Sequence, residues 1–158
     1  MFRELRRIKN KISIEEAKEL LHKEKRGVFA VNGDNGYPFA IPVDYFFDEQ
    51  DNKIIFHGAK SGHKVDSLKK DNKVCFTIFG DESFNEGDWA PYLKSVVVFG
   101  RCNMIEDIDI TTDKIRTLAS RFYPSSEEVE LEIQKYIKDA LLYEIDIEHI
   151  CGKKIHEK

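Results

Sequence analysis

The segment FHGAKSGHKVDSL, residues 56–68, decides the fold class, because an apolar strand runs there into a basic, glycine-containing turn and then into an amphipathic helical stretch. Gly58 and Gly62 allow the backbone to approach a ligand closely. The N–H groups that open the following helix point toward the same turn. The other polar and charged residues of the turn are Lys60, Ser61, His63 and Lys64. This pattern is typical of a phosphate-binding turn; the alternative is a surface helix with Ser61 as its N-cap.

The residues before this turn predict two strands that lead into it. The segment YPFAIPVDYFFDEQDNKIIFHGA, residues 37–59, divides into two apolar strands at the polar turn 48–52. Pro38 and Pro42 have no backbone N–H group, so neither can donate a hydrogen bond in the middle of a fully paired sheet. Pro42 therefore marks an edge, a bulge or an opening. Another apolar strand is predicted after the helix, at residues 73–80.

The rest of the chain predicts short strands and helices in a local order. A capping box from Ser13 to Glu16 predicts a helix over residues 14–25 that Gly27 ends, and the turn 34–36 joins two strands as a hairpin. The C-terminal part predicts, in order, a loop at 81–91, the longest strand of the chain from 92, a helix at 111–122, a second helix from 126 and a strand at 141–150. Because the helices are grouped rather than alternating with strands, the sequence favours an α+β antiparallel barrel over a doubly wound sheet.

In order and spacing, these segments resemble the FMN-binding split barrel of the pyridoxamine 5'-phosphate oxidase-like superfamily, and within it the nitroimidazole-resistance flavoproteins. The segments that carry the resemblance are GYPFAIPVDY (36–45), FHGAKSGHKVDSLKKDNKVCF (56–76), YLKSVVVFGR (92–101) and YEIDIEHICGK (143–153). The resemblance implies an α+β fold, an antiparallel split β-barrel with peripheral helices, formed as a single domain by residues 1–158.

The resemblance also implies FMN as the cofactor. An FMN phosphate is close to doubly charged at neutral pH, so it needs fixed donors and positive charge. The turn can supply both, with Lys64 as the main cation. The residues that the resemblance implies as its partners in the phosphate contact are Lys60, Ser61 and His63.

The resemblance places the isoalloxazine ring of FMN against two strands. The implied ring-binding residues are Ile41, Pro42, Val43 and Asp44 on the first strand, and Phe56, His57 and Gly58 on the second. Simple core packing is the alternative for Ile41 and Val43, because alternation gives each strand residue one face only. His57 is the candidate catalytic residue, since it lies at a strand end and titrates near neutral pH. A structural role is the alternative for this histidine.

The resemblance further implies a homodimer with the flavin sites at its interface, where Trp89 and Ser95 would reach the flavin of the second subunit or cover the substrate. Ordinary interface packing is the alternative for Trp89. The implied activity is that of an oxidoreductase that reduces a small acceptor such as a nitroaromatic compound, with NAD(P)H as a transient donor. The alternatives are a non-catalytic flavin-binding or redox-sensing protein, and a split barrel that uses haem or deazaflavin. The segment CGKKIHEK, 151–158, lacks the arginine found in pyridoxamine phosphate oxidases, which argues against vitamin B6 oxidation.

Composition restricts the remaining function classes. The net charge is −4 with both signs mixed along the 158 residues, which argues against a general nucleic-acid surface. No apolar run approaches the ~20 residues that span a bilayer, and the first residues lack a secretory signal, so the sequence predicts a cytoplasmic protein without a membrane segment. Neither a disulfide framework nor a metal site is expected, because no CxxC pair occurs among Cys75, Cys102 and Cys151.

Overall fold

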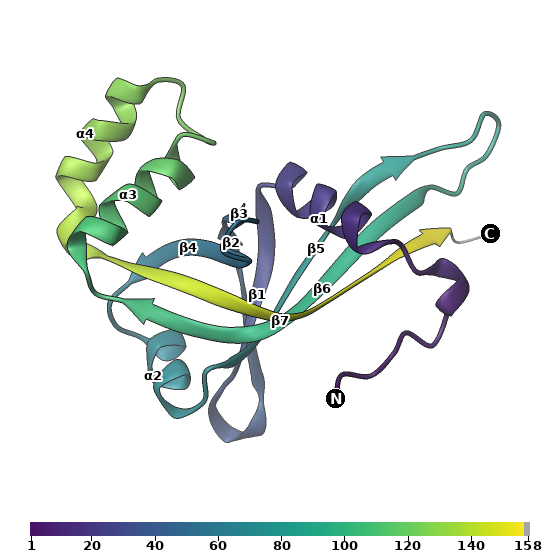
Figure 1. Ribbon diagram of the computed structural model, residues 1–158, viewed down its shortest axis with the longest axis horizontal. Coiled ribbons are helices and arrows are strands. Elements are labelled where there is room, and N and C mark those ends of the chain that lie inside the picture. The colour runs from purple at the N-terminus through teal and green to yellow at the C-terminus, as the bar shows by residue number, and fades with distance from the viewer. Residues whose placement is uncertain (157–158) are drawn as a thin grey trace.

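The computed structural model describes residues 1–156 and shows an α+β fold with one curled sheet and peripheral helices (Figure 1). The strands are β1 (Arg26–Asn32), β2 (Pro38–Asp44), β3 (Phe46–Asp48), β4 (Lys53–Ala59), β5 (Lys73–Ser83), β6 (Tyr92–Ile105) and β7 (Ala140–His156). The α-helices are α1 (Ile14–Lys23), α2 (His63–Lys70), α3 (Ile108–Ala119) and α4 (Ser126–Tyr136), and the 3-10 helices are η1 (Ile8–Asn10), η2 (Asp34–Gly36) and η3 (Ile137–Asp139). No α-helix in the described part of the chain is both long enough and apolar enough to pass through a lipid bilayer.

The seven strands form one antiparallel sheet in the order β2-β1-β5-β6-β7-β4-β3. Three strands separate β1 from β4 in that order, yet the rings of Phe29 in β1 and Phe56 in β4 lie 4.8 Å apart. The sheet therefore curls on itself into an open barrel with an apolar interior. This confirms the expected split barrel.

Strand β4 is buried on both faces, and this arrangement decides where its side chains point. Phe56 belongs to the cluster inside the barrel. Its neighbour Ile55 belongs to a second cluster outside the barrel, against α3 and α4. Because successive side chains of a strand alternate, His57 shares the outer face with Ile55 and Gly58 shares the inner face with Phe56.

Strand β2 lies at one end of the sheet order, which agrees with the edge expected from its prolines. It pairs on one side only, where Pro38 is opposite Asn32 and Pro42 is opposite Val28. At the other end of the sheet, β3 has only three residues. Neither terminal strand therefore presents a long row of free backbone donors.

Several predicted boundaries are wrong, in one case because a tertiary contact overrides a local signal and in another because a local helix cap was missed. Helix α1 ends at Lys23, and Gly27 lies in β1, where a Cβ atom would be 2.2 Å from the Phe76 ring. Gly27 therefore serves close packing against the neighbouring strand β5. Helix α3 begins earlier than expected, because Asp107 caps it by accepting from two backbone N–H groups. Strand β7, with 17 residues, is longer than β6, with 14.

The capping box at the start of α1 is confirmed and gives a stability prediction. Ser13 Oγ accepts a hydrogen bond from the Glu16 N–H, and the Ser13 N–H donates to the Glu16 carboxylate, both at 3.1 Å. Ser13→Ala should lower the free energy of unfolding by about 1 kcal/mol, as measured by urea denaturation. Ser126→Ala is the matched control, because Ser125 rather than Ser126 caps α4. Equal losses in the two variants would contradict the prediction.

Candidate functional site

The turn between β4 and α2 leaves the N-terminus of α2 without a side-chain cap. Gly62 is the N-cap residue and has φ +118°, a conformation that side chains with a Cβ atom rarely adopt. Ser61 is exposed and does not cap the helix, so the alternative expectation of a Ser61 cap is wrong. The first N–H groups of a helix have no intrahelical partner. This end of α2 therefore offers free donors and a partial positive charge to an anion.

Lys64 in the first turn of α2 reaches back over β4. Its Nζ lies 4.3 Å from the centroid of the Tyr143 ring and 5.7 Å from that of Phe56. A Cβ atom on Gly58 would be 2.6 Å from this Nζ, so the path of the lysine depends on a glycine at position 58. Tyr143 is held in place because its hydroxyl donates to the Ala59 carbonyl at 2.6 Å.

The amine of Lys64 is half-buried and forms no ion pair with a carboxylate of the described residues. Burial lowers the pKa of Lys64, since desolvation disfavours its charged form. Charges held away from water are normally paired with an opposite charge. Lys64 and the free end of α2 together are therefore suited to an anionic ligand such as a phosphate.

The other charged residues of the turn point elsewhere. Lys60 donates from Nζ to the Lys138 carbonyl in η3. The His63 ring packs against the Phe39 ring at a centroid distance of 4.2 Å, and its Nε2 lies 3.6 Å from an Asp34 carboxylate oxygen. Four side chains were expected around a phosphate, those of Lys60, Ser61, His63 and Lys64. Only the side chain of Lys64 points inward over β4.

The strand residues expected near a flavin ring fall on different faces. Ile41 and Val43 pack against the barrel interior, in agreement with the core-packing alternative. Pro42 is exposed, and Asp44 forms an ion pair with Arg26. Phe56 is fully buried, so its ring has no surface left for a ligand and only its backbone remains a candidate contact.

His57 lies on the outer face of β4 and lines a cavity formed with α3 and α4. The side chain keeps an exposed side, but the surrounding protein desolvates it, and this effect lowers the pKa of His57. The negative charge of Asp44 opposes this lowering, while the positive charge of Lys64 adds to it. A neutral imidazole at this position can accept a proton at one ring nitrogen and donate a hydrogen bond from the N–H group of the other.

The lowered pKa of His57 predicts a pH dependence of stability. Between the lowered pKa and the ordinary value of 6.5, the unfolded chain binds more protons than the folded chain. Stability should therefore fall as the pH drops from 6.5 through the lowered pKa, and the penalty is complete below it. His57→Gln should remove this part of the decline in the free energy of unfolding. Urea denaturation at a series of pH values measures it. Parallel pH profiles of the two proteins would contradict it.

Trp89 lies in the connection between β5 and β6, and the end of this hairpin projects away from α2 and from the α3–α4 pair (Figure 1), while Ser95 lies in β6 opposite Phe79 of β5. Trp89 is 73% exposed, and Ser95 is half-buried in β6. Within one chain neither residue lies beside the turn that precedes α2. Any contact of theirs with a ligand at that turn would have to come from a second copy of the chain.

The three cysteines are free, and each thiol has a raised pKa for which desolvation is the largest cause. For the buried Cys102 the pKa is raised to about 12. The thiols are therefore protonated at neutral pH and are poor nucleophiles. This is consistent with a packing role for the cysteines as small apolar side chains.

The curled antiparallel sheet and the turn before α2 define a split-barrel protein. The sequence model of the family described as pyridoxamine 5'-phosphate oxidase matches residues 13–154, and the chain belongs to that family. No curated protein sequence matches the chain.

Solved structures with the same fold include three with informative descriptions. A candidate 5-nitroimidazole antibiotic resistance protein from Bacteroides thetaiotaomicron has a TM-score of 0.75 and 14% identity, over 92% of this chain and 87% of that one. A FAD-binding protein from Mesorhizobium loti has a TM-score of 0.68 and 18% identity, over 92% and 96%. A FAD and heme binding protein from Mycobacterium smegmatis has a TM-score of 0.70 and 18% identity, over 92% and 72%. At these identities the likenesses establish the fold alone.

Proposed function

We propose that this protein binds FMN and passes electrons from the flavin to a small acceptor such as a nitroaromatic compound. The observation that carries the proposal is the half-buried amine of Lys64, which lacks a carboxylate partner among the described residues and lies at the start of α2. Gly58 leaves the space that this amine occupies. Membership of the pyridoxamine 5'-phosphate oxidase family supports the same choice of ligand.

The turn before α2 suits a phosphate monoester because it combines a positive charge with free hydrogen-bond donors. The free N–H groups at the start of α2 can donate to the phosphate oxygens, and the Lys64 ammonium can neutralise part of their charge. Gly62, with its positive φ, lets the backbone turn into the helix without a side chain at that point. The cavity between Lys60 and the start of α3, with a volume near 320 Å³, provides further space on the side of Lys60.

His57 is the residue that we propose for proton transfer. The flavin, when bound, supplies the redox step by accepting and releasing electrons. Reduction of an organic acceptor also consumes protons, and a histidine with a lowered pKa can transfer a proton near neutral pH. The helices α3 and α4 cover this face of β4 and would limit the access of water to the acceptor.

The first experiment is identification of the chromophore that copurifies with the protein. Absorption spectroscopy followed by chromatography and mass analysis of the released cofactor should give one FMN per chain. FAD or haem, which are named for two of the similar structures, would replace FMN in the proposal. A colourless protein that does not bind added FMN would contradict it.

The proposed turnover is tested separately from cofactor binding. The reduced holoprotein should be reoxidised under anaerobic conditions by a nitroaromatic compound, and His57→Gln should slow this step without changing flavin content. Reoxidation no faster than that of free reduced FMN would favour a flavin-binding or redox-sensing protein over an enzyme.

We also propose that two copies of the chain associate, with Trp89 and Ser95 of one copy near the flavin of the other. Exposed aromatic side chains on the projecting hairpin support this arrangement, since Phe84 is 57% and Trp89 is 73% exposed. Sedimentation velocity at micromolar concentration should give the mass of a dimer, and a monomer would contradict the shared site.

A further inference from the structure

A second cavity, distinct from the turn before α2, lies on the outer face of β4. It has a volume of about 150 Å³, and β4 contributes His57 to its wall. The apolar part of the wall comes from Ile115 and Ala119 in α3 and from Ile133 in α4. Lys64 and Gly58 point to the opposite face of the same strand. The Lys64 amine and this cavity therefore lie on opposite faces of β4.

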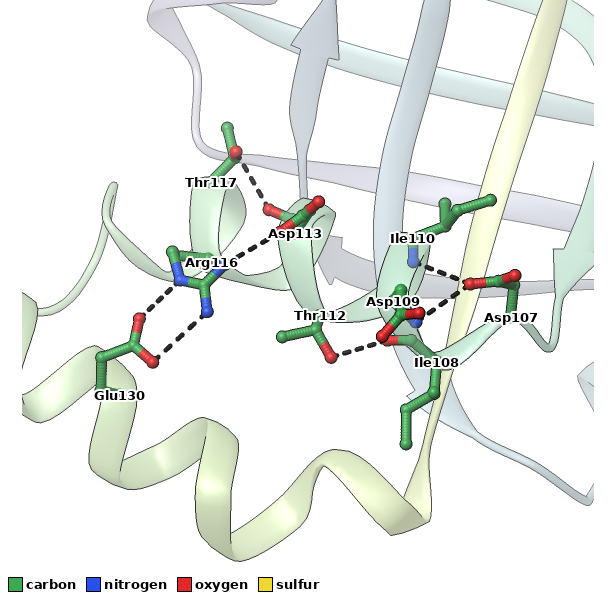
Figure 2. A network of polar contacts seen from close by, with 9 residues as sticks. All are labelled: Asp107, Ile108, Asp109, Ile110, Thr112, Asp113, Arg116, Thr117 and Glu130. Atoms are coloured by element: carbon green, nitrogen blue, oxygen red, sulfur yellow. Dashed lines mark hydrogen bonds and ion pairs between the residues drawn. The ribbon is translucent and has the colours of Figure 1, made fainter.

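The helices that form this cavity are held together, so its walls are preformed. Figure 2 shows Arg116 of α3 forked onto the carboxylate of Glu130 in α4 and bonded to Asp113 in its own helix at 3.0 Å. Ile115 and Ile133 are buried between the helices and the sheet. A preformed wall lowers the cost of ordering side chains when a ligand binds.

The volume restricts the ligand to one ring. An apolar cavity of about 150 Å³ is large enough for benzene, and it is too small for the three fused rings of a flavin. Tyr136 also lines the cavity and is 49% exposed, and Lys135 lies over its ring at 4.9 Å from the centroid.

One acidic side chain belongs to the wall of the cavity, and its charge also acts on Lys135 of α4. Glu132 of α4 lines the cavity and is half-buried, and within residues 1–156 its carboxylate makes neither a hydrogen bond nor an ion pair. A carboxylate beside an apolar cavity favours a ligand that brings a hydrogen-bond donor or a positive charge.

We propose that this cavity binds a compound with a single aromatic ring that carries a donor or a positive charge, with Glu132 as its polar partner and His57 beside the ring. The inference deepens the proposed function by giving the electron acceptor a size and a binding site. It depends on that function only for the role of the ligand as acceptor. The binding itself does not require a flavin.

The test uses the purified protein with whatever cofactor it carries and two probes of similar size, benzylammonium and toluene. Ile115, Ile133 and Ile137 line the cavity, so their labelled methyl groups report on it in NMR spectra. Ile54 and Ile78 in the barrel interior are internal references. Benzylammonium should shift the three lining methyl signals saturably, with a dissociation constant on the order of 1 mM, and leave the references unchanged. Shifts spread equally over both groups would overturn the proposal.

Two variants identify the contacts. Glu132→Gln should weaken benzylammonium binding about threefold, as expected for one partly exposed charge pair, and leave toluene binding unchanged. Ala119→Phe should fill the cavity and abolish binding of both probes, whereas Gln134→Phe, at an exposed position of α4, should not. If Ala119→Phe does not fold, the Glu132→Gln comparison still decides. Unchanged selectivity in Glu132→Gln would overturn the assignment of that residue.

The same samples separate this inference from the proposed function. Flavin content is measured from their absorption before the probes are added. Flavin-containing protein without methyl shifts would contradict ligand binding in the cavity and support the flavoprotein proposal. Methyl shifts in a protein that binds no flavin would support ligand binding in the cavity and contradict the flavoprotein proposal.

Discussion

Replacement of Lys64 by alanine should reduce the affinity for FMN by about 10- to 100-fold. A hydrogen bond to a charged group contributes about 1.5–3 kcal/mol, and each 1.4 kcal/mol corresponds to about a factor of ten in affinity. Lys64 is the one charged side chain of the turn that points inward over β4, since Lys60 and His63 contact Lys138 and Asp34 instead. Fluorescence titration of the apoprotein with FMN measures the loss.

Lys69→Ala is the matched control, because Lys69 is exposed in the last turn of the same helix. It should bind FMN as the parent protein does. Lys64→Ala apoprotein should lose no more than about 1 kcal/mol of stability relative to the parent apoprotein, since the amine has no carboxylate partner among the described residues and the favourable contacts it loses are those with the rings of Tyr143 and Phe56. Full flavin affinity in Lys64→Ala would exclude Lys64 as the phosphate ligand.

Replacement of Phe56 by alanine should have the largest effect on stability, with a loss of about 3–5 kcal/mol in the free energy of unfolding. The Phe56 ring is fully buried between the ring of Phe29, at 4.8 Å, and the parallel ring of Tyr143, at 5.1 Å. Its removal opens a cavity at the place where the two halves of the curled sheet meet. Urea denaturation followed by circular dichroism measures the loss.

Phe84→Ala removes the same side chain from the β5–β6 hairpin, where it is 57% exposed, and should change stability by less than about 0.5 kcal/mol. A Phe56→Ala protein as stable as Phe84→Ala would mean that the ring does not join the two halves of the barrel. Because Phe56 also lies beneath Lys64, flavin affinity should be compared only at denaturant-free conditions where both variants are folded.

Those parts of the fold that depend on local pattern follow from the sequence. The capping box at Ser13, the hairpin turn at residues 34–36 and the edge position of Pro42 are all confirmed. Each of these signals acts through a few neighbouring residues. The end of α1 was predicted wrongly because the glycine at position 27 is required by its close contact with the Phe76 ring, which lies far along the chain, and not by the end of a helix.

The candidate site was predicted only to the level of its turn. The sequence places Lys60, His63 and Lys64 together, but their directions depend on partners that no local pattern contains: the carbonyl of Lys138, the carboxylate of Asp34 and the ring of Tyr143. Tyr143 escaped notice because its apolar strand resembles any other. A cavity between two helices and a strand likewise has no signature in the order of residues.

The two ends of the sheet also bear on how copies of this chain can associate. An open sheet edge is a template on which a strand of another molecule can add, and unlimited addition leads to aggregation. Here one end is β2, with prolines at positions 38 and 42, and the other is the three-residue β3. Both ends of the sheet thus disfavour strand-by-strand growth into fibres, and any association of two copies would depend on side-chain packing between faces.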